Sequence, residues 1–566
     1  MLRRAALVAA LPLALAAGAS RLAAQDACDG RPIRTIRIDP RAIFSADDSL
    51  IPRFVRGLGN AVHWQTREAV VRLDLLFAVG DACDPRRLRE TERLLRARPY
   101  IRSAQVVATP TGDGGVAVLV TTHDELSIEG HVQVAGPGFP LRHVSLGEEN
   151  VLGRGLRFQT QYSNEGRRPS FYANALDPHF LDRRLELEVE GGKSEVGPVA
   201  EETIRRAFES DFDRVAWRES LRYRKEPFAL VSSSLGTVLQ PLVAMGADVG
   251  VAARFGEPGR LHILGLALSA ERLHVESAPL APTPDLDSAA AAQLGGRFEE
   301  RRRVRANLFL GARTVRFEPR RGVDAVHALE DVPVGTQAGM VLGKSMFGGG
   351  GLQHDWFAAM ELQTGTDVGP RFLLFSRAKI EGRYLTSAGR WDGVLADAQL
   401  LVYSIEPRVT TVVSAEAAGG WETRIPFQLL LAGPDGIRGY GSSALPAGRR
   451  IVLRAERRYL LGSVLGFADA GAAVFAETGR GWTGDAAFGE NSGMIGTVGV
   501  GLRLAAPRGS RRTYRLDLAV PVTGGFSPEL RLAIGQQFGI FHGEPQDVVR
   551  SRESISSVTV FDFPRF

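Results

Sequence analysis

The sequence predicts a small α+β domain followed by a large antiparallel β-barrel that crosses a membrane. Three observations carry this prediction. An export signal opens the chain, the long C-terminal part alternates between apolar and polar residues, and no later segment offers the ~18 uninterrupted apolar residues of a spanning helix. Glycine is also abundant, with 64 among 566 residues, which favours closely paired strands and turns over helices.

Residues 1–24 have the parts of a secretory signal peptide. Arg3 and Arg4 form a basic start, an apolar run follows, and small residues place cleavage after Ala19 or Ala24. The apolar run is shorter than the ~20 residues of a membrane-spanning helix, and a retained anchor is the alternative. We therefore expect an exported protein.

Composition argues against two classes of protein, namely disordered chains and chains with a basic nucleic-acid-binding tail. Charged residues make up 23% and hydrophobic residues 44% of the chain, which argues against disorder. The formal charge of +5 is spread along the sequence, without the block of like charge that marks a nucleic-acid-binding tail. We expect no nucleic-acid partner.

Cys28 and Cys83 are the only cysteines of the chain. In an oxidising compartment this even count favours one disulfide, with two free buried thiols as the alternative. A lipid-modified Cys28 is a third interpretation. The preceding Gln-Asp-Ala argues against it, because small apolar residues normally precede a lipidated cysteine.

Residues 25–123 predict a small α/β module with the order β-α-α-β-β. Apolar patterning defines the elements, Asp84-Pro85 supplies a helix cap and first turn, and TGDGG indicates a hairpin. The predicted elements are strand 33–38, helix 66–77, a helix from Asp84 to near Tyr100, and strands 103–109 and 116–122.

Residues 124–541 predict the barrel. In residues 185–190, Leu, Leu and Val share one face and three Glu the other, and residues 514–520 repeat the pattern. In lipid every backbone group must be paired internally, so the strands must close on themselves and point their charges into the lumen. At roughly 25 residues per strand and connection, the segment holds about 16 strands. Two soluble β-sandwiches are the alternative.

The stretch Val79–Val106, "VGDACDPRRLRETERLLRARPYIRSAQV", resembles the POTRA domain, the periplasmic module of the outer-membrane assembly-factor superfamily. In that family a GD-x-x-(D)-P-x-x-L helix leads into a strand that starts with an aromatic residue. The resemblance implies that residues 25–123 form a single POTRA-like domain in the periplasm. A generic small α/β fold remains the alternative.

Four further stretches resemble the barrel of the BamA/TamA-like group of this superfamily. They are GEENVLGRGLRF (Gly147–Phe158), DPHFL (Asp177–Leu181), GIRGYG (Gly436–Gly441) and LRLAIGQQF (Leu530–Phe538). The matched residues are Asn150, Gly153 and Gly155; Asp177 and Pro178; Gly436, Ile437, Arg438, Gly439 and Tyr440; and Gly535 and Phe538 as the closing-strand signal. Together these stretches span nearly the whole mature chain in the family's order.

Arg438 stands in a loop rich in glycine and proline, which alone would indicate only a turn. In the family this loop folds into the lumen, and its arginine bonds acidic residues of the wall. By motif position these are Glu456 and Asp469. Alternation in residues 451–460 directs Glu456 inward, where Arg454 and Arg458 are alternative partners. The inward direction of Asp469 rests on the resemblance.

Residues 542–566 continue past the expected closing strand as a tail. The end of this tail, SVTVFDFPRF, partly alternates and is a rival closing strand. We favour Phe538 as the closing aromatic, and we expect removal of residues 543–566 to leave assembly intact.

The sequence contains no H-E-x-x-H, G-x-S-x-G, P-loop or C-x-x-C motif, so we expect no enzyme, cofactor or metal. The resemblance implies an outer-membrane barrel that assists the insertion or translocation of unfolded outer-membrane or secreted client proteins. Its other partners would be the lipid bilayer and periplasmic chaperones or accessory proteins. The alternatives are a two-partner-secretion-type transporter and a passive pore or structural barrel.

Overall fold

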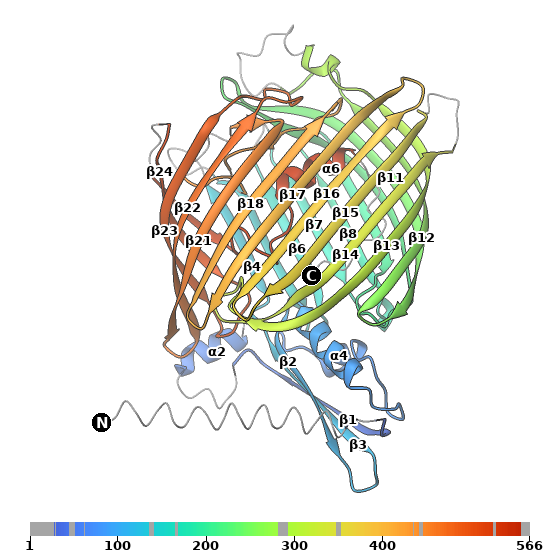
Figure 1. The fold of residues 1–566 in the computed structure, drawn as a ribbon, viewed down its shortest axis with the longest axis vertical. Helices are drawn as coiled ribbons and strands as arrows, with labels where there is room; N and C mark the ends of the chain where they lie inside the picture. The colour runs from blue at the N-terminus through green and yellow to red at the C-terminus, as the bar shows by residue number, and fades with distance from the viewer. Residues whose placement is uncertain are drawn as a thin grey trace. The chain divides into compact units, whose positions relative to one another are not determined.

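The computed structural model describes residues 28, 30–44, 51–61, 63–134, 141–164, 168–280, 293–346, 353–433, 435–440, 445–524 and 528–555 (Figure 1). The predicted signal peptide and the end of the tail, residues 556–566, lie outside the described residues. The chain divides into two compact units. The first contains Met1–Ile128, Glu148–Arg157 and Pro178–Arg184, and the second contains Glu129–Gly147, Phe158–Asp177 and Leu185–Phe566.

The first unit is built on a three-stranded sheet. Strand β3 (Val116–Asp124) lies in the middle, parallel to β1 (Ile33–Arg41) and antiparallel to β2 (Ile101–Pro110). Helices α2 (Arg53–Ala61), α3 (Glu68–Leu73) and α4 (Pro85–Ala97) complete the unit. The sequence predicted two helices, and α2 is the one it missed. The apolar side chains of α3, α4 and the sheet form one buried core.

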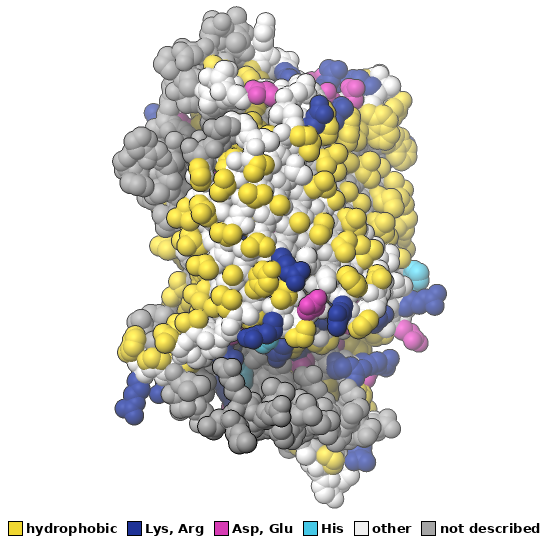
Figure 2. All heavy atoms as spheres, turned by 60° about the vertical axis from the view of Figure 1, so that its left-hand side comes forward, with side chains coloured by type: hydrophobic (Ala, Val, Ile, Leu, Met, Phe, Trp, Pro, Cys, Tyr) yellow, Lys and Arg dark blue, Asp and Glu magenta, His cyan; other side chains and the backbone are white. Residues whose placement is uncertain are grey.

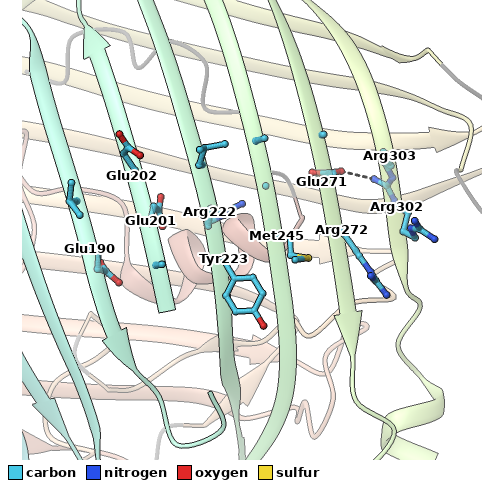
Figure 3. Close-up of a pocket in the computed structure, with 16 residues that line it drawn as sticks. Glu190, Glu201, Glu202, Arg222, Tyr223, Met245, Glu271, Arg272, Arg302 and Arg303 are labelled. Atoms are coloured by element: carbon cyan, nitrogen blue, oxygen red, sulfur yellow. Dashed lines mark hydrogen bonds and ion pairs between the residues drawn. The ribbon is translucent and has the colours of Figure 1, made fainter. Parts of the chain in front are cut away.

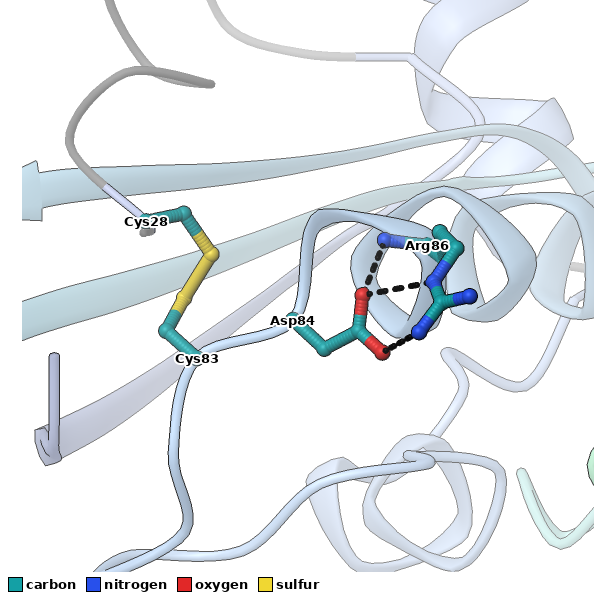
Figure 4. Close-up of a disulfide and its surroundings, with 4 residues drawn as sticks. All are labelled: Cys28, Cys83, Asp84 and Arg86. Carbon is teal, nitrogen blue, oxygen red and sulfur yellow. Dashed lines mark hydrogen bonds and ion pairs between the residues drawn. A yellow bond between two sulfur atoms is a disulfide. The ribbon is translucent and has the colours of Figure 1, made fainter. Parts of the chain in front are cut away.

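The expected disulfide between Cys28 and Cys83 is present, and both cysteines are buried in this core (Figure 4). Asp84 follows immediately and caps α4, since its carboxylate accepts a hydrogen bond from the backbone N–H of Arg86 at 2.8 Å. The crosslink therefore holds the N-terminal end of the described chain next to the start of a capped helix.

The second unit is a closed antiparallel barrel, as the sequence predicts, but it has twenty strands instead of about 16. The estimate was too low because several hairpin connections are only two or three residues long, so each strand with its connection uses about 20 residues. Strand β25 lies next to β4 and closes the barrel.

The strands are β4 (Ile128–Val134), β5 (Leu141–Val151), β6 (Leu156–Ser163), β7 (Ser170–Asp177), β8 (Glu186–Lys193), β9 (Pro198–Arg206), β10 (Val215–Ser232), β11 (Gly236–Glu257), β12 (Arg260–Val275), β13 (Arg301–Arg321), β14 (Leu329–Ser345), β15 (Asp355–Val368), β16 (Phe372–Leu385), β17 (Arg390–Glu406), β18 (Val409–Trp421), β21 (Arg449–Val464), β22 (Ala468–Trp482), β23 (Gly493–Ala505), β24 (Tyr514–Pro521) and β25 (Glu529–Ile534). Short elements outside the wall are η1 (Phe180–Asp182), β19 (Leu429–Leu430) and β20 (Pro446–Ala447).

The outer face of the barrel is apolar. On β12, Leu264, Leu266 and Leu268 are exposed, whereas the alternate residues Ile263 and Ala267 are buried. Figure 2 shows one side of this face, with hydrophobic side chains across its middle and charged side chains gathered toward its ends. Such an outer face is typical of barrels that span a membrane. None of the helices among the described residues has the length and apolarity needed to cross a membrane.

The closing strand is shorter than predicted. β25 ends at Ile534, and Gly535 adopts a φ of +83°, which favours glycine and redirects the chain. Phe538 is then buried in a cluster with Tyr403 and Ile540. The interpretation of Phe538 as the closing aromatic of the strand is therefore wrong. Gln537, which accepts a hydrogen bond from Arg515 at 2.8 Å, helps to hold this segment inside.

The chain after β25 enters the lumen and forms helix α6 (Gln546–Ile555), so the described part of the tail is helical (Figure 1). Its neighbours are inward-facing residues of the wall and the loop between β18 and β21. Alternation did not predict this helix, because a helix inside a polar lumen needs charged residues on more than one side.

Reducing the disulfide is expected to destabilise the first unit. The crosslink joins residues 55 positions apart, and in the chain-entropy model closure of such a loop contributes about 4 kcal/mol. Hydrogen exchange of β1 to β3 in the full-length protein should therefore accelerate when reductant is added. A Cys28→Ser/Cys83→Ser variant should exchange at the faster rate with or without reductant; an unchanged wild-type rate would contradict the expectation.

Candidate functional site

The connection between β18 and β21 folds into the barrel. Leu431, Ile437 and Tyr440 from this connection are buried in one cluster with Val452 of β21 and Ile495 of β23. The segment that contains Arg438 is therefore docked on the inner wall, which is where the sequence resemblance placed it.

Arg438 is bonded by three carboxylates from three strands. Its backbone N–H and its Nε donate to Glu477 of β22 at 2.8 and 3.0 Å, and its Nη1 donates to Asp517 of β24 at 2.8 Å. Nη2 donates to Glu456 of β21 at 3.2 Å and also lies 2.8 Å from Glu477. Only 1% of the Arg438 surface is exposed. The planar guanidinium serves all three partners because its N–H groups point in different directions.

The ring of Phe475, two residues before Glu477 on β22, forms a floor for this site. The guanidinium carbon of Arg438 lies 3.4 Å from the ring centroid, a cation–π contact. Residues 475 and 477 face the same side of their strand because side chains alternate along it. One strand therefore supplies both the aromatic floor and the most extensively bonded carboxylate.

A second set of arginines balances the carboxylates around Arg438. Glu456 also accepts from Arg458 at 2.9 Å and from Arg503 at 3.3 Å, and Arg503 lies 2.5 Å from Asp517. Buried charges are tolerated when each is paired and hydrogen-bonded, whereas removal of one partner leaves an uncompensated charge. The site is thus a connected network, and Arg438 is the member that comes from the loop.

The two residues after Arg438 fit tightly. Gly439 has a φ of +90°, a conformation that favours glycine, and its N–H donates to Glu529 of β25 at 2.8 Å. The hydroxyl of Tyr440 donates to the carbonyl of Gly496 at 2.6 Å and accepts from the N–H of the same residue at 2.9 Å. Gly436 packs so closely that a Cβ would lie 2.6 Å from the backbone of Ala432. These contacts give physical reasons for the G-I-R-G-Y pattern.

Asp469 is not a partner of Arg438. It lies at the other end of β22, where it accepts from the N–H of Gly509 at 2.8 Å and from Arg508 at 3.4 Å. Eight residues separate Asp469 from Glu477, which corresponds to about 26 Å along a strand. Glu477 and Asp517 were not predicted as partners of Arg438, although alternation places Asp517 on the charged face of residues 514–520 and Glu477 on the same face as Phe475.

The early-hairpin residues hold a turn within the first unit. The amide of Asn150 donates to the carbonyl of Trp64 at 2.8 Å and accepts from the N–H of Gly155 at 2.8 Å. Gly153 and Gly155 both have a φ of +69°, and a Cβ on Gly155 would lie 2.5 Å from the hydroxyl of Tyr100. The conformation of this turn thus requires these glycines.

Asp177 is the last residue of β7, and Pro178 begins the following turn. The next residue, His179, was not singled out by the sequence. Its Nε2 lies 2.9 Å from buried Asp74, which also accepts from Arg98 at 2.9 Å. Burial raises the pKa of Asp74, but Arg98 and His179 outweigh this effect and hold the pKa well below its ordinary value.

The wall from β8 to β13 lines a hollow of about 730 Å³, and its lining residues are drawn in Figure 3. It contains the ion pair between Arg303 and Glu271 at 3.2 Å, and Tyr223, Met245 and Arg272 line it. No serine, cysteine or histidine is among its described lining residues. Within the described ranges, no group of three or more His, Cys, Asp or Glu side chains could hold a metal ion.

Comparisons with known proteins give remote similarities. No family model and no curated protein matches the chain. The solved structures that are similar to it include BamA from Haemophilus ducreyi lacking POTRA domains 1–3, with 11% identity, a TM-score of 0.37 and coverage of 89% of this chain and 83% of that chain. CdiB from Escherichia coli has 13% identity and a TM-score of 0.36, with coverage of 90% of this chain and 76% of that chain. The copper transporter OprC has 10% identity and a TM-score of 0.33, with coverage of 76% of this chain and 85% of that chain. At these scores the similarities do not establish a family.

Replacing Arg438 with alanine is expected to free the loop and destabilise the barrel by about 3–5 kcal/mol, because three carboxylates lose a shared buried partner. The unfolded fraction as a function of temperature, measured from heat-modifiable gel mobility, should shift to lower temperature. Arg457→Ala is the control, since Arg457 is exposed and alternates with the inward residues of the same strand. Equal midpoint temperatures of unfolding for the Arg438→Ala and Arg457→Ala proteins would contradict the role of Arg438.

Substitutions of Glu456 and Asp469, the two carboxylates predicted from the sequence, should differ sharply in their effect on proteolysis of the loop. Glu456→Gln is expected to expose the loop to proteolysis, because Arg438 and Arg458 both lose a charged acceptor. Asp469→Asn should leave loop proteolysis unchanged, since its partners lie at the other end of β22. Cleavage within residues 433–440, followed by mass spectrometry, distinguishes the two. Loop cleavage in Asp469→Asn to the same extent as in Glu456→Gln would contradict the assignment.

Proposed function

We propose that this protein is an outer-membrane barrel of the BamA/TamA-like type that assists the insertion or translocation of outer-membrane or secreted proteins. The observation that carries the proposal is the R-G-Y segment, held inside the barrel by Arg438 and three wall carboxylates. Such a buried network is costly to build unless the position of the loop matters. The predicted signal peptide, the single POTRA-like domain and the apolar outer face favour a location in the outer membrane, with the first unit in the periplasm.

The closing seam supports the mechanism in which a client strand pairs with an opened barrel edge. β25 has six residues and β4 has seven, whereas β10 and β11 have eighteen and twenty-two. A short pair has fewer ladder hydrogen bonds to break, and an opened edge offers unpaired N–H and C=O groups to an incoming strand. The sheet of the first unit offers further edges at β1 and β2, each of which pairs only with β3 in that sheet.

A two-partner-secretion-type transporter is the second candidate, and the docked R-G-Y segment suits it equally. A passive pore is less well supported, because the described lumen contains both this segment and α6. The single POTRA-like domain predicted from the sequence argues against this second candidate, since two-partner-secretion transporters usually carry two.

Site-specific photocrosslinking tests the proposal. A photoreactive residue at Leu532 of β25 should capture nascent outer-membrane proteins in cells, because this strand borders the seam. The same residue at Leu266 of β12 is the control, since Leu266 is also exposed on the outer face but lies far from the seam. Purified protein should also accelerate the folding of barrel proteins into liposomes. Adducts that form equally at both positions, together with no acceleration, would refute the proposal.

A further inference from the structure

Helix α6 lies in the lumen, where it contacts β17 and the docked connection. Near its start, Asp547 bonds Arg450 of β21, and farther along the guanidinium of Arg550 lies 4.5 Å from the ring centroid of Phe228 on β10. In the closed strand order, β10 and β21 are nine positions apart among twenty. The ion pairs of the helix thus lie on one side of the lumen, on β16, β17 and β21, and the long side chain of Arg550 extends toward β10.

The first attachment surrounds Asp547. Its carboxylate accepts from Arg450 at 3.2 Å and from the backbone N–H of Leu430 at 2.7 Å. Arg450 is also bonded to Glu416 of β18 at 3.0 Å, so the wall orients the cation before Asp547 reaches it. The backbone N–H of Gln546 donates to Asp435 at 2.7 Å, which joins α6 to the segment that carries Arg438.

The second attachment surrounds Arg552. This side chain is bonded to Asp397 of β17 and to Glu544, and its Nε lies 3.2 Å from Glu381 of β16. Arg552 is only 6% exposed, and Glu381 and Asp397 are buried as well. The wall thus presents a cation on β21 and two carboxylates on β16 and β17, which match the opposite charges of α6.

Between the charged attachments the contact is apolar. Val548 is 3% exposed and belongs to a cluster with Leu395 of β17, Ala418 of β18, and Phe427 and Leu429 of the docked connection. The hydroxyl of Ser551 bonds within the helix, to the carbonyl of Asp547 at 2.7 Å. Along α6, the order is therefore the carboxylate of Asp547, the apolar Val548 and the guanidinium of Arg552. Each of the three contacts a wall residue of matching character.

We propose that this wall is a docking surface for a helical peptide with a carboxylate and a guanidinium five residues apart, and that residues 543–555 are its resting occupant. The occupant follows the last strand of the barrel and is held by non-covalent contacts, so it can leave and rebind. While it is bound, it obstructs the lumen; when it leaves, the lumen conducts. This inference concerns the resting lumen and goes beyond the proposed function, because it holds whichever proteins the barrel handles.

Ion conductance of the full-length protein in planar bilayers tests the proposal directly. Arg552→Gln and Asp397→Asn should each raise the open probability at least several-fold. The double variant should not exceed Arg552→Gln by much, because that substitution already removes the ion pair with Asp397. Arg218→Gln is the control, since Arg218 pairs with Asp248 at 3.5 Å on the wall formed by β10 and β11. Heat-modifiable mobility confirms that each variant is folded.

A synthetic peptide with the sequence of residues 543–555, GEPQDVVRSRESI, supplies the second arm. Added to the folded Arg552→Gln protein, it should return the open probability toward the wild-type level. The same peptide with glutamate at the position of Arg552 should not. Unchanged conductance of the folded Arg552→Gln and Asp397→Asn proteins, or equal block by both peptides, would overturn the proposal. Conductance needs no client, so its outcome is separate from the crosslinking result.

Discussion

A charged side chain that points into a lumen filled with protein loses most of its water, and it is stable there only beside an opposite charge. Much of the interior of this barrel follows from that constraint. Arg438 brings a cation from the β18–β21 connection to carboxylates on β21, β22 and β24, while α6 brings Asp547 and Arg552 to complementary charges elsewhere on the wall. Both insertions are thus specified by charge, and apolar packing around Ile437 and Val548 consolidates them.

The lipid-facing side obeys the opposite rule. Backbone groups must be paired within the sheet and charges kept away from the middle of the outer face, which produces the alternation along strands such as β12. The two rules act on successive residues of the same strand. A strand such as β21 can therefore place Glu456 and Arg458 inside while Ile451 and Leu453 face outward. The wall is accordingly both a membrane surface and a binding surface.

Alternation allowed the barrel and the inward direction of Glu456 to be predicted from the sequence. It could not give the strand number, because hairpin length depends on turn geometry that period-two patterns do not report. Asp469 was misassigned because its motif position indicates the correct strand but not how far along that strand the partner of Arg438 lies. Phe538 fitted a closing-strand pattern, but Gly535 redirects the chain. The sequence alone does not show whether a single glycine continues a strand or turns the chain. Helix α6 escaped prediction because its partners on the wall lie at least 97 residues away in sequence.

The tail follows the last strand directly, and this order has a consequence for biogenesis. Residues 546–555 follow all twenty strands in the chain, and their docking surface consists of β16, β17 and β21. The receptor wall must therefore be folded before its occupant can bind. The wall can therefore assemble while α6 is still outside it. In the proposed resting state, the segment that follows the last strand occupies the lumen, so occupation of the lumen is a step separate from closure of the sheet.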